Sequence, residues 1–275
     1  MLLLENQGSL NHENLHNAWK KLAATSESIH GRISVQAALK NIKSGLTAPQ
    51  SGRFNPHYFD DAALPRAAVI GVTHAAEPEV AGTVAMLDAS FTQFEDGVWC
   101  ASAVASLFSG ASTAVPIRQL IQGVVNSLPP GSLTRTTVMK ALDGIDATES
   151  SIVTTAFFLS TDICNQIYSY GNIAHEILAS LLVILRATDG DYEKMLACAA
   201  LIPTTGGTLM ALSAALGSVI EGRSATGWGL GENQQILRGL SLPFLNGVNI
   251  LDIATQLGEL VATDTNSRTK GKKLL

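Results

Sequence analysis

LIPTTGGTLMALSAALGSVIEG, residues 201–222, is a turn rich in threonine and glycine that opens onto a run of small residues. Alanine, serine and glycine leave little side chain on a helix, so neighbouring backbones can approach it closely. We therefore expect this helix to lie in the middle of a helical bundle. Its first turn has backbone N–H groups without intrahelical partners, which makes it a candidate site for an anion or a polar ligand.

The composition indicates a globular protein with one large domain or two small ones. Of its 275 residues, 46% are hydrophobic and 15% are charged, enough to bury a sizeable core. The formal net charge of −5 argues against a general nucleic-acid binder, because no broad basic surface can displace counterions from phosphates. Cys100, Cys164 and Cys198 stand far apart in apolar surroundings, so we expect buried thiols rather than disulfides or a zinc site.

The sequence has no obvious targeting or membrane segment. MLLLENQ lacks the basic stretch and the long apolar run of a signal peptide. No window reaches the roughly 18 uninterrupted apolar residues of a membrane span. We therefore expect a cytoplasmic protein that makes no membrane contact. The basic run RTKGKK lies near the C-terminal end, and residues 263–275 are expected to be a disordered tail.

Apolar residues at helical spacing dominate the rest of the chain. Ser34 and Asp96 are the expected N-caps of two helices. No alternating strand pattern and no internal repeat is present, so the sequence predicts an all-α protein. A division at Pro129-Pro130-Gly131 is conceivable, but apolar helices on both sides favour a turn within one domain. The expected helices are residues 10–22, 35–45, 80–89, 97–112, 116–128, 136–142, 151–164, 173–186, 235–240 and 248–261, with loops at 46–59 and 165–172.

The order of motifs resembles that of the ADP-ribosylglycohydrolase family. SGRFNPHYFDDAALPRAAVIG, residues 51–71, is similar to the family's Ser-Gly loop and its Gly-x-x-Met-Arg-x-x-Pro-x-Gly core, with Arg66 and Gly71 in matching positions. Asp88 and Thr92 match a later Asp and Thr-His landmark, although Gln93 replaces the histidine. The resemblance implies one orthogonal helical bundle over residues 31–262, with residues 1–30 as an N-terminal helix outside it.

The family's metal-binding motifs are missing from this sequence. In the family, Gly-Gly-Asp-Thr-Asp-Thr precedes the small-residue helix, and two of its carboxylates bind metal. The corresponding residues here are PTTGGT, 203–208, in which only Thr208 matches, while Thr205 and Gly207 replace the carboxylates. The family's N-terminal Thr-Asp-Asp motif has no counterpart before Gly31. Mg²⁺ prefers hard oxygen ligands that include a carboxylate, so we expect no metal and no cofactor.

Asp60, Asp61 and Arg66 are candidate site residues in the family-like core. Two adjacent carboxylates can divide acid and base roles if their surroundings separate their pKa values. The alternative is that one caps a helix while its neighbour is solvated. Arg66 could orient an anionic ligand, or it could form a structural ion pair with Asp60 or Asp61.

His175 and Glu176 are further acid–base candidates in a strongly apolar helical segment. The resemblance implies a glutamate close to the ligand cleft in this part of the chain, and histidine titrates near neutral pH. The alternative places one of the two at the bundle surface and bonds the other to a backbone carbonyl.

The altered turn could itself bind a ligand. Glycine lets the backbone approach a bound group closely, and threonine hydroxyls both donate and accept hydrogen bonds. A nest for a phosphate or carboxylate is therefore one interpretation, and simple capping of the following helix is the other. The residues of this turn are Thr204, Thr205, Gly206, Gly207 and Thr208.

Three functions follow from these features. The favoured one is a metal-independent enzyme that hydrolyses, dehydrates or cyclises a polar or anionic small metabolite, for example in a biosynthetic pathway. The second is an inactive relative that binds an ADP-ribose-like ligand or a protein partner. The third is an active ADP-ribosyl hydrolase with metal ligands elsewhere in the chain. The oligomeric state is not indicated by the sequence.

Overall fold

Helices make up the secondary structure of the described residues. The computed structural model describes residues 1–25, 28–146, 151–167, 171–223 and 235–272. These residues contain isolated bridges but no β-strand, so the all-α prediction is confirmed. The α-helices are α1 (Leu2–Glu5), α2 (His12–Ala24), α3 (Ile33–Lys43), α4 (Gln50–Arg53), α5 (Leu64–Thr73), α6 (Pro78–Ala89), α7 (Asp96–Ala111), α8 (Ile117–Ser127), α9 (Leu133–Asp146), α10 (Ile152–Phe158), α11 (Ala174–Thr188), α12 (Tyr192–Ala200), α13 (Gly206–Glu221) and α15 (Ile250–Lys272). Short turns η1 (Asp61–Ala63) and η3 (Pro203–Thr205) precede α5 and α13, and η2 (Leu159–Ile163) continues α10.

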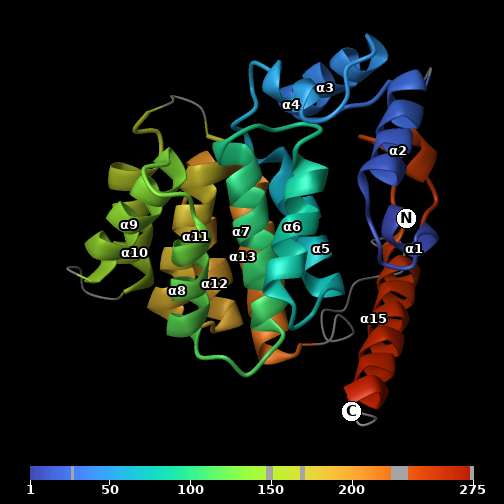
Figure 1. The fold of residues 1–275 in the computed structure, drawn as a ribbon. Coiled ribbons are helices and arrows are strands. Elements are labelled where there is room, and N and C mark those ends of the chain that lie inside the picture. Colours follow the sequence, from blue (N-terminus) through green and yellow to red (C-terminus); the bar gives the residue numbers. More distant parts are fainter. Residues whose placement is uncertain (26–27, 147–150, 168–170, 224–234, 273–275) are drawn as a thin grey trace.

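α11 is the central helix of the bundle (Figure 1). Its sequence AHEILASLLVILRAT is apolar on every side, and every residue from Ala174 to Leu185 is buried. A helix without a polar face has to be covered all round. α7, α9, α12 and α13 pack against it and provide that cover. Burial of this helix therefore determines where its neighbours lie.

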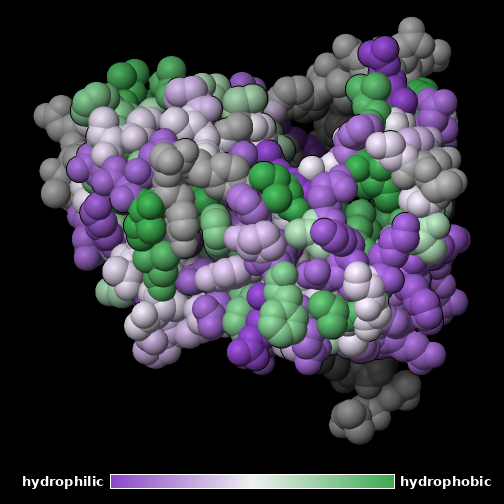
Figure 2. Space-filling view, turned by 90° about the horizontal axis from the view of Figure 1, so that it is seen from above, coloured by the Kyte–Doolittle hydropathy of each residue, from purple (hydrophilic) through white to green (hydrophobic). Residues whose placement is uncertain are grey.

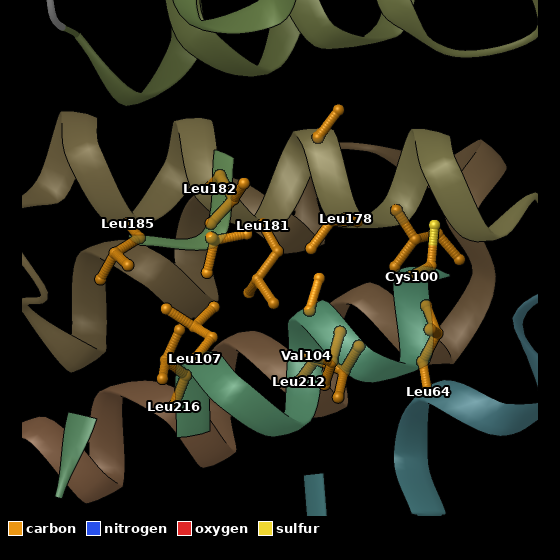
Figure 3. Packing of buried hydrophobic residues seen from close by; sticks show 14 of the residues in the cluster. Leu64, Cys100, Val104, Leu107, Leu178, Leu181, Leu182, Leu185, Leu212 and Leu216 are labelled. Carbon is orange, nitrogen blue, oxygen red and sulfur yellow. The ribbon is translucent and has the colours of Figure 1, made fainter. Parts of the chain in front are cut away.

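The side chains of α7, α11 and α13 belong to one continuous core. Figure 3 shows the leucines of α11 facing Val104 and Leu107 of α7, with Leu212 and Leu216 of α13 at the same interface. The cluster includes buried residues from both sides of Pro129. The apolar core therefore continues across the Pro129-Pro130-Gly131 turn.

α13 has one face exposed, although we expected it in the middle of the bundle. Leu212 and Leu216 are buried, whereas Ala211 is exposed. α13 packs against α5, α7, α11 and α12 but is not enclosed on all sides, so the prediction is right about its neighbours and wrong about its complete burial. A Cβ on Gly217 would lie 2.9 Å from Cα of Tyr192, so α12 and α13 can pack at this distance only with glycine at residue 217.

α2 and α3 form a second apolar cluster beside the bundle. Leu15 and Trp19 of α2 meet Leu39 and Ile42 of α3 around Phe91, which follows α6. Figure 1 shows α1, α2 and α15 along the same edge of the molecule. No helix in the described part of the chain is long and apolar enough to cross a bilayer.

Several segments differ from the helices and loops expected from sequence. The loop expected at 46–59 contains α4, and residues 168–170 of the loop expected at 165–172 lie outside the described residues. Residues 236–240 are not helical: the Leu237 N–H donates to the Val248 carbonyl at 2.8 Å instead. α15 continues to Lys272, into the segment expected to be a tail.

Gly71 permits the close contact between α5 and α7. A Cβ at this residue would lie 2.5 Å from the Ala105 carbonyl oxygen and 2.7 Å from Cβ of Phe108. Gly71→Ala should therefore lower the free energy of unfolding by about 2 kcal/mol, as measured by urea denaturation. Gly123→Ala in α8 is the matched control, because nothing lies within 4 Å of its Cβ. The control should gain roughly 0.5–1 kcal/mol, and equal stabilities of the two variants would contradict this packing.

Candidate functional site

Several helices begin at the same end of the bundle, which is the upper end in Figure 1. The segment before α5 lies beside the start of α11: the Asp61 N–H donates to the Asn172 carbonyl, and the Ala174 N–H donates to the Phe59 carbonyl, both at 3.0 Å. Helix N-termini carry partial positive charge, which favours acidic side chains nearby. This end of the bundle is therefore suited to hold the acidic candidates.

Asp60 is buried and fully engaged with protein donors. Its Oδ1 accepts hydrogen bonds from Ser34 Oγ at 2.6 Å, Gln93 Nε2 at 2.8 Å and the Ala62 N–H at 3.0 Å. Its Oδ2 accepts from the Ser34 N–H at 3.3 Å. The interpretation of Asp60 as an N-cap is confirmed, since it caps η1. Its carboxylate also joins α3 to the segment before α7.

Asp61 forms a cluster with Arg32 and Thr208. Arg32 Nε lies 2.9 Å from Asp61 Oδ1, and Arg32 Nη2 donates to Asp61 Oδ2 at 3.0 Å and to Thr208 Oγ1 at 3.2 Å. Burial raises the pKa of Asp61, although the Thr208 hydrogen bond and the Arg32 charge act in the opposite direction. The expectation of a solvated second aspartate is wrong, because Asp61 is buried and the positive charge of Arg32 offsets the cost of removing its carboxylate from water.

Arg66 lies apart from this cluster. Its Nε pairs with Asp88 Oδ2 at 2.7 Å, and its Nη2 donates to Thr92 Oγ1 at 3.0 Å. The alternative of a structural ion pair is therefore right, but its partner is Asp88 rather than Asp60 or Asp61. The start of α5 turns the two aspartates toward α3 and α13, whereas Arg66 faces α6.

His175 and Glu176 are both buried at the start of α11. Burial lowers the pKa of His175 to about 4, against the influence of the Asp96 carboxylate. Burial raises the pKa of Glu176, whose Oε2 accepts a hydrogen bond from the Asn165 N–H at 3.0 Å. The expectation that one of them lies at the surface is wrong, because neighbouring segments cover α11 all round.

Two expected N-caps have other partners. Arg32, not Ser34, precedes α3, and the Ser34 hydroxyl donates to Asp60. Asp96 is the first residue of α7, and its Oδ1 accepts from Thr134 N at 2.8 Å and Thr134 Oγ1 at 2.7 Å. Asp96 therefore stabilises the start of α9. Both side chains have contacts with segments distant in sequence.

The altered turn contributes one side chain to the Asp61 cluster. Thr205 donates to the Ile202 carbonyl at 3.0 Å, and the Thr204 carbonyl lies against Gly171. Gly206 and Gly207 are the first two residues of α13. Thr208 is thus the residue of the turn that contacts Arg32.

A cavity of about 550 Å³ lies beside the cluster, lined by Gly31, Arg32, Ile33 and Asn172. Figure 2 looks onto this end of the molecule and shows hydrophilic and hydrophobic residues mixed on its surface. The side chain of Arg32 is 36% exposed, whereas that of Asp61 is 0% exposed. The guanidinium group therefore faces the cavity and the carboxylate lies behind it. Sequence reasoning missed Arg32, which directly precedes α3, because its partners Asp61 and Thr208 are distant in the chain.

The residues around Thr208 do not fit the metal site of the family. Asp61 is the carboxylate that lies close by, and it is already paired with the positive charge of Arg32. Within the described ranges, no group of three or more His, Cys, Asp or Glu side chains is arranged to hold a metal ion. A guanidinium group repels a divalent cation, and Mg²⁺ requires hard oxygen ligands.

His175 makes the stability of the fold depend on pH. Its imidazole takes up a proton near pH 4 in the folded chain, against an ordinary value of 6.5. The unfolded chain therefore binds the proton first, and this residue lowers the free energy of unfolding by up to about 3 kcal/mol as the pH falls from 6.5 to 4. The raised pKa values of Asp61 and Glu176 act with the opposite sign.

His175→Gln should consequently lose less stability than the unaltered protein between pH 6.5 and pH 4, as measured by urea unfolding at each pH. His30→Gln is the control, because it removes an exposed imidazole. Parallel pH profiles for the original protein and His175→Gln would contradict this role of the buried imidazole.

Comparison with known proteins identifies the family of the chain. The sequence profile of the ADP-ribosylglycohydrolase family matches residues 1–218. The match starts before residue 31, where the resemblance traced from motifs begins. No curated protein and no solved structure matches the chain. Because the match spans well over half of the 275 residues, the chain belongs to the ADP-ribosylglycohydrolase family.

Proposed function

We propose that this protein is a metal-independent member of its family that binds an anionic small molecule beside Arg32 and catalyses a hydrolase-like reaction on it. The observation that carries the proposal is the Asp61–Arg32–Thr208 cluster at the edge of the cavity. Family membership supports a hydrolase-like reaction.

Arg32 is the group that meets the ligand. Its Nη2 donates to Asp61 and Thr208, and its Nε lies 2.9 Å from Asp61 Oδ1. We therefore propose Nη1 as the group that donates to the ligand. The paired contact with Asp61 holds the guanidinium plane in one orientation before the ligand arrives. A pre-oriented guanidinium forms strong, charge-assisted hydrogen bonds to phosphate or carboxylate groups.

Asp61 is the proton-transfer group of this proposal. Among the acidic candidates it is the one that pairs with a lining residue of the cavity, Arg32, and burial raises its pKa. A ligand anion that draws the guanidinium toward itself weakens the pair and uncovers the carboxylate. Asp61 then accepts a proton from a water molecule as the water oxygen attacks the substrate carbon, and it returns that proton to the leaving group.

A ligand-binding protein without catalysis is the second candidate. It is favoured by the engagement of the other candidates: Asp60 is saturated with donors, His175 is buried and neutral, and Glu176 accepts from the loop before α11. None of these three side chains is among the described residues that line the cavity beside Arg32. Binding and turnover therefore have to be measured separately.

Calorimetric titration with ADP-ribose in EDTA tests the binding step. Arg32→Gln should weaken binding by roughly tenfold to a hundredfold, since a hydrogen bond between charged groups is lost. Arg32→Lys keeps the partner charge for Asp61 but loses the forked geometry, so it should also bind more weakly. The control is Arg53→Gln, which removes an exposed arginine on α4. Tighter binding when Mg²⁺ replaces EDTA would contradict metal independence.

Turnover of a panel of anionic glycosides, with ADP-ribosylated peptides among them, tests the chemical step. The protein should release product in EDTA, and Asp61→Asn should lower the rate by about a hundredfold or more while ADP-ribose still binds. Binding of ADP-ribose without turnover of any compound would favour the non-catalytic alternative. Turnover that requires Mg²⁺ would instead indicate an ADP-ribosyl hydrolase with a metal site elsewhere in the chain.

A further inference from the structure

A second cavity, of about 360 Å³, lies between α1, α2 and α5. Its walls are apolar and include Leu2, Leu15, Trp19, Ile70 and Phe244. Its volume is within the range of pockets that bind small molecules, about 300–1,000 Å³. It is separate from the cavity beside Arg32, with which it shares no lining residue among those described.

One polar pair, Arg66 and Asp88, forms part of the lining. The side chain of Arg66 is 29% exposed and that of Asp88 only 9%, so more of the arginine than of the aspartate side chain is accessible at the cavity. Nε donates to Asp88, Nη1 to the Ala62 carbonyl at 3.0 Å and Nη2 to Thr92. A guanidinium has five N–H groups. Three donate to these residues, and the other two have no acceptor among the described residues, so they can donate to a ligand.

The guanidinium is also held in place by an aromatic ring. Its central carbon lies over the Trp19 ring, 5.3 Å from the ring centre. This contact and the Asp88 pair orient the remaining N–H groups before any ligand binds. The polar end of the cavity therefore suits a hydrogen-bond acceptor, above all a negatively charged one.

The mouth of the cavity is apolar as well. Met1, Val69 and Phe244 contribute to the lining, yet they are 58%, 43% and 53% exposed. Large apolar side chains grouped at the surface indicate a place where an apolar group binds. Here they continue the apolar wall outward from Arg66.

We propose that this cavity binds one molecule that has an unbranched apolar chain and a carboxylate head group. The head group accepts hydrogen bonds from the remaining N–H groups of Arg66. The chain lies along the leucines of α1 and α2 and extends to Phe244 at the mouth. A hydrogen-bond acceptor suits this end better than a cationic donor, because the remaining N–H groups of Arg66 donate and the Asp88 carboxylate is already paired.

Calorimetric titration of the full chain with decanoate, below its micelle concentration, tests this proposal. One decanoate should bind per chain, and more tightly than decanol. Ala18 lines the cavity, so Ala18→Phe should weaken decanoate binding by about tenfold or more. Asn17→Phe is the matched control, because it adds the same ring to an exposed neighbour on α2. Arg66→Lys should narrow the difference between decanoate and decanol.

Val69→Trp provides a second test from the opposite wall, should Ala18→Phe fail to fold as judged by circular dichroism. It should also weaken decanoate binding, while Asn17→Phe leaves it unchanged. Lack of decanoate binding to the unaltered protein would overturn the proposal, and so would equal binding to folded Ala18→Phe and Asn17→Phe. Decanol that binds as tightly as decanoate would overturn the assignment of the head group.

Discussion

The need to cover α11 on all sides is the constraint on which the rest of the structure depends. Its apolar residues leave no face for water, so α7, α9, α12 and α13 surround it. This packing brings the starts of α5, α11 and α13 together at one end of the bundle. The site residues are thus placed by a purely apolar requirement, before any polar contact is considered.

The acids gathered at that end determine the polar contacts around them. A buried carboxylate without donors is strongly destabilising, so each one needs hydrogen bonds or a cation. Asp60 has Ser34 and Gln93, and Asp61 has Arg32. A guanidinium group thereby supplies the positive charge near Thr208, where the family resemblance implies metal ions. The same contact that stabilises the buried acid presents a cation to the cavity.

Two arginine–aspartate pairs border two different cavities in this molecule. Arg32 pairs with Asp61 beside a polar opening, and Arg66 pairs with Asp88 in an apolar one. Hydrogen bonds lead from one pair toward the other: Arg66 donates to Thr92, whose hydroxyl contacts Gln93, and Gln93 donates to Asp60, the chain neighbour of Asp61. The same buried network that holds Arg66 therefore also holds Asp60, next to the residue that pairs with Arg32.

The all-α class, the family resemblance and the absence of its metal-binding carboxylates were determined by the sequence alone, because helical spacing and motif order are local properties. The tertiary structure decided which hydrogen-bond or ion-pair partner each polar side chain has. Serine and aspartate are typical N-cap residues, yet the Ser34 hydroxyl bonds to Asp60 and the Asp96 carboxylate bonds to Thr134. Arg66 pairs with Asp88, and it is Arg32 that pairs with Asp61 beside the cavity. These outcomes depend on which helices meet, and helix packing joins residues that are far apart in the chain.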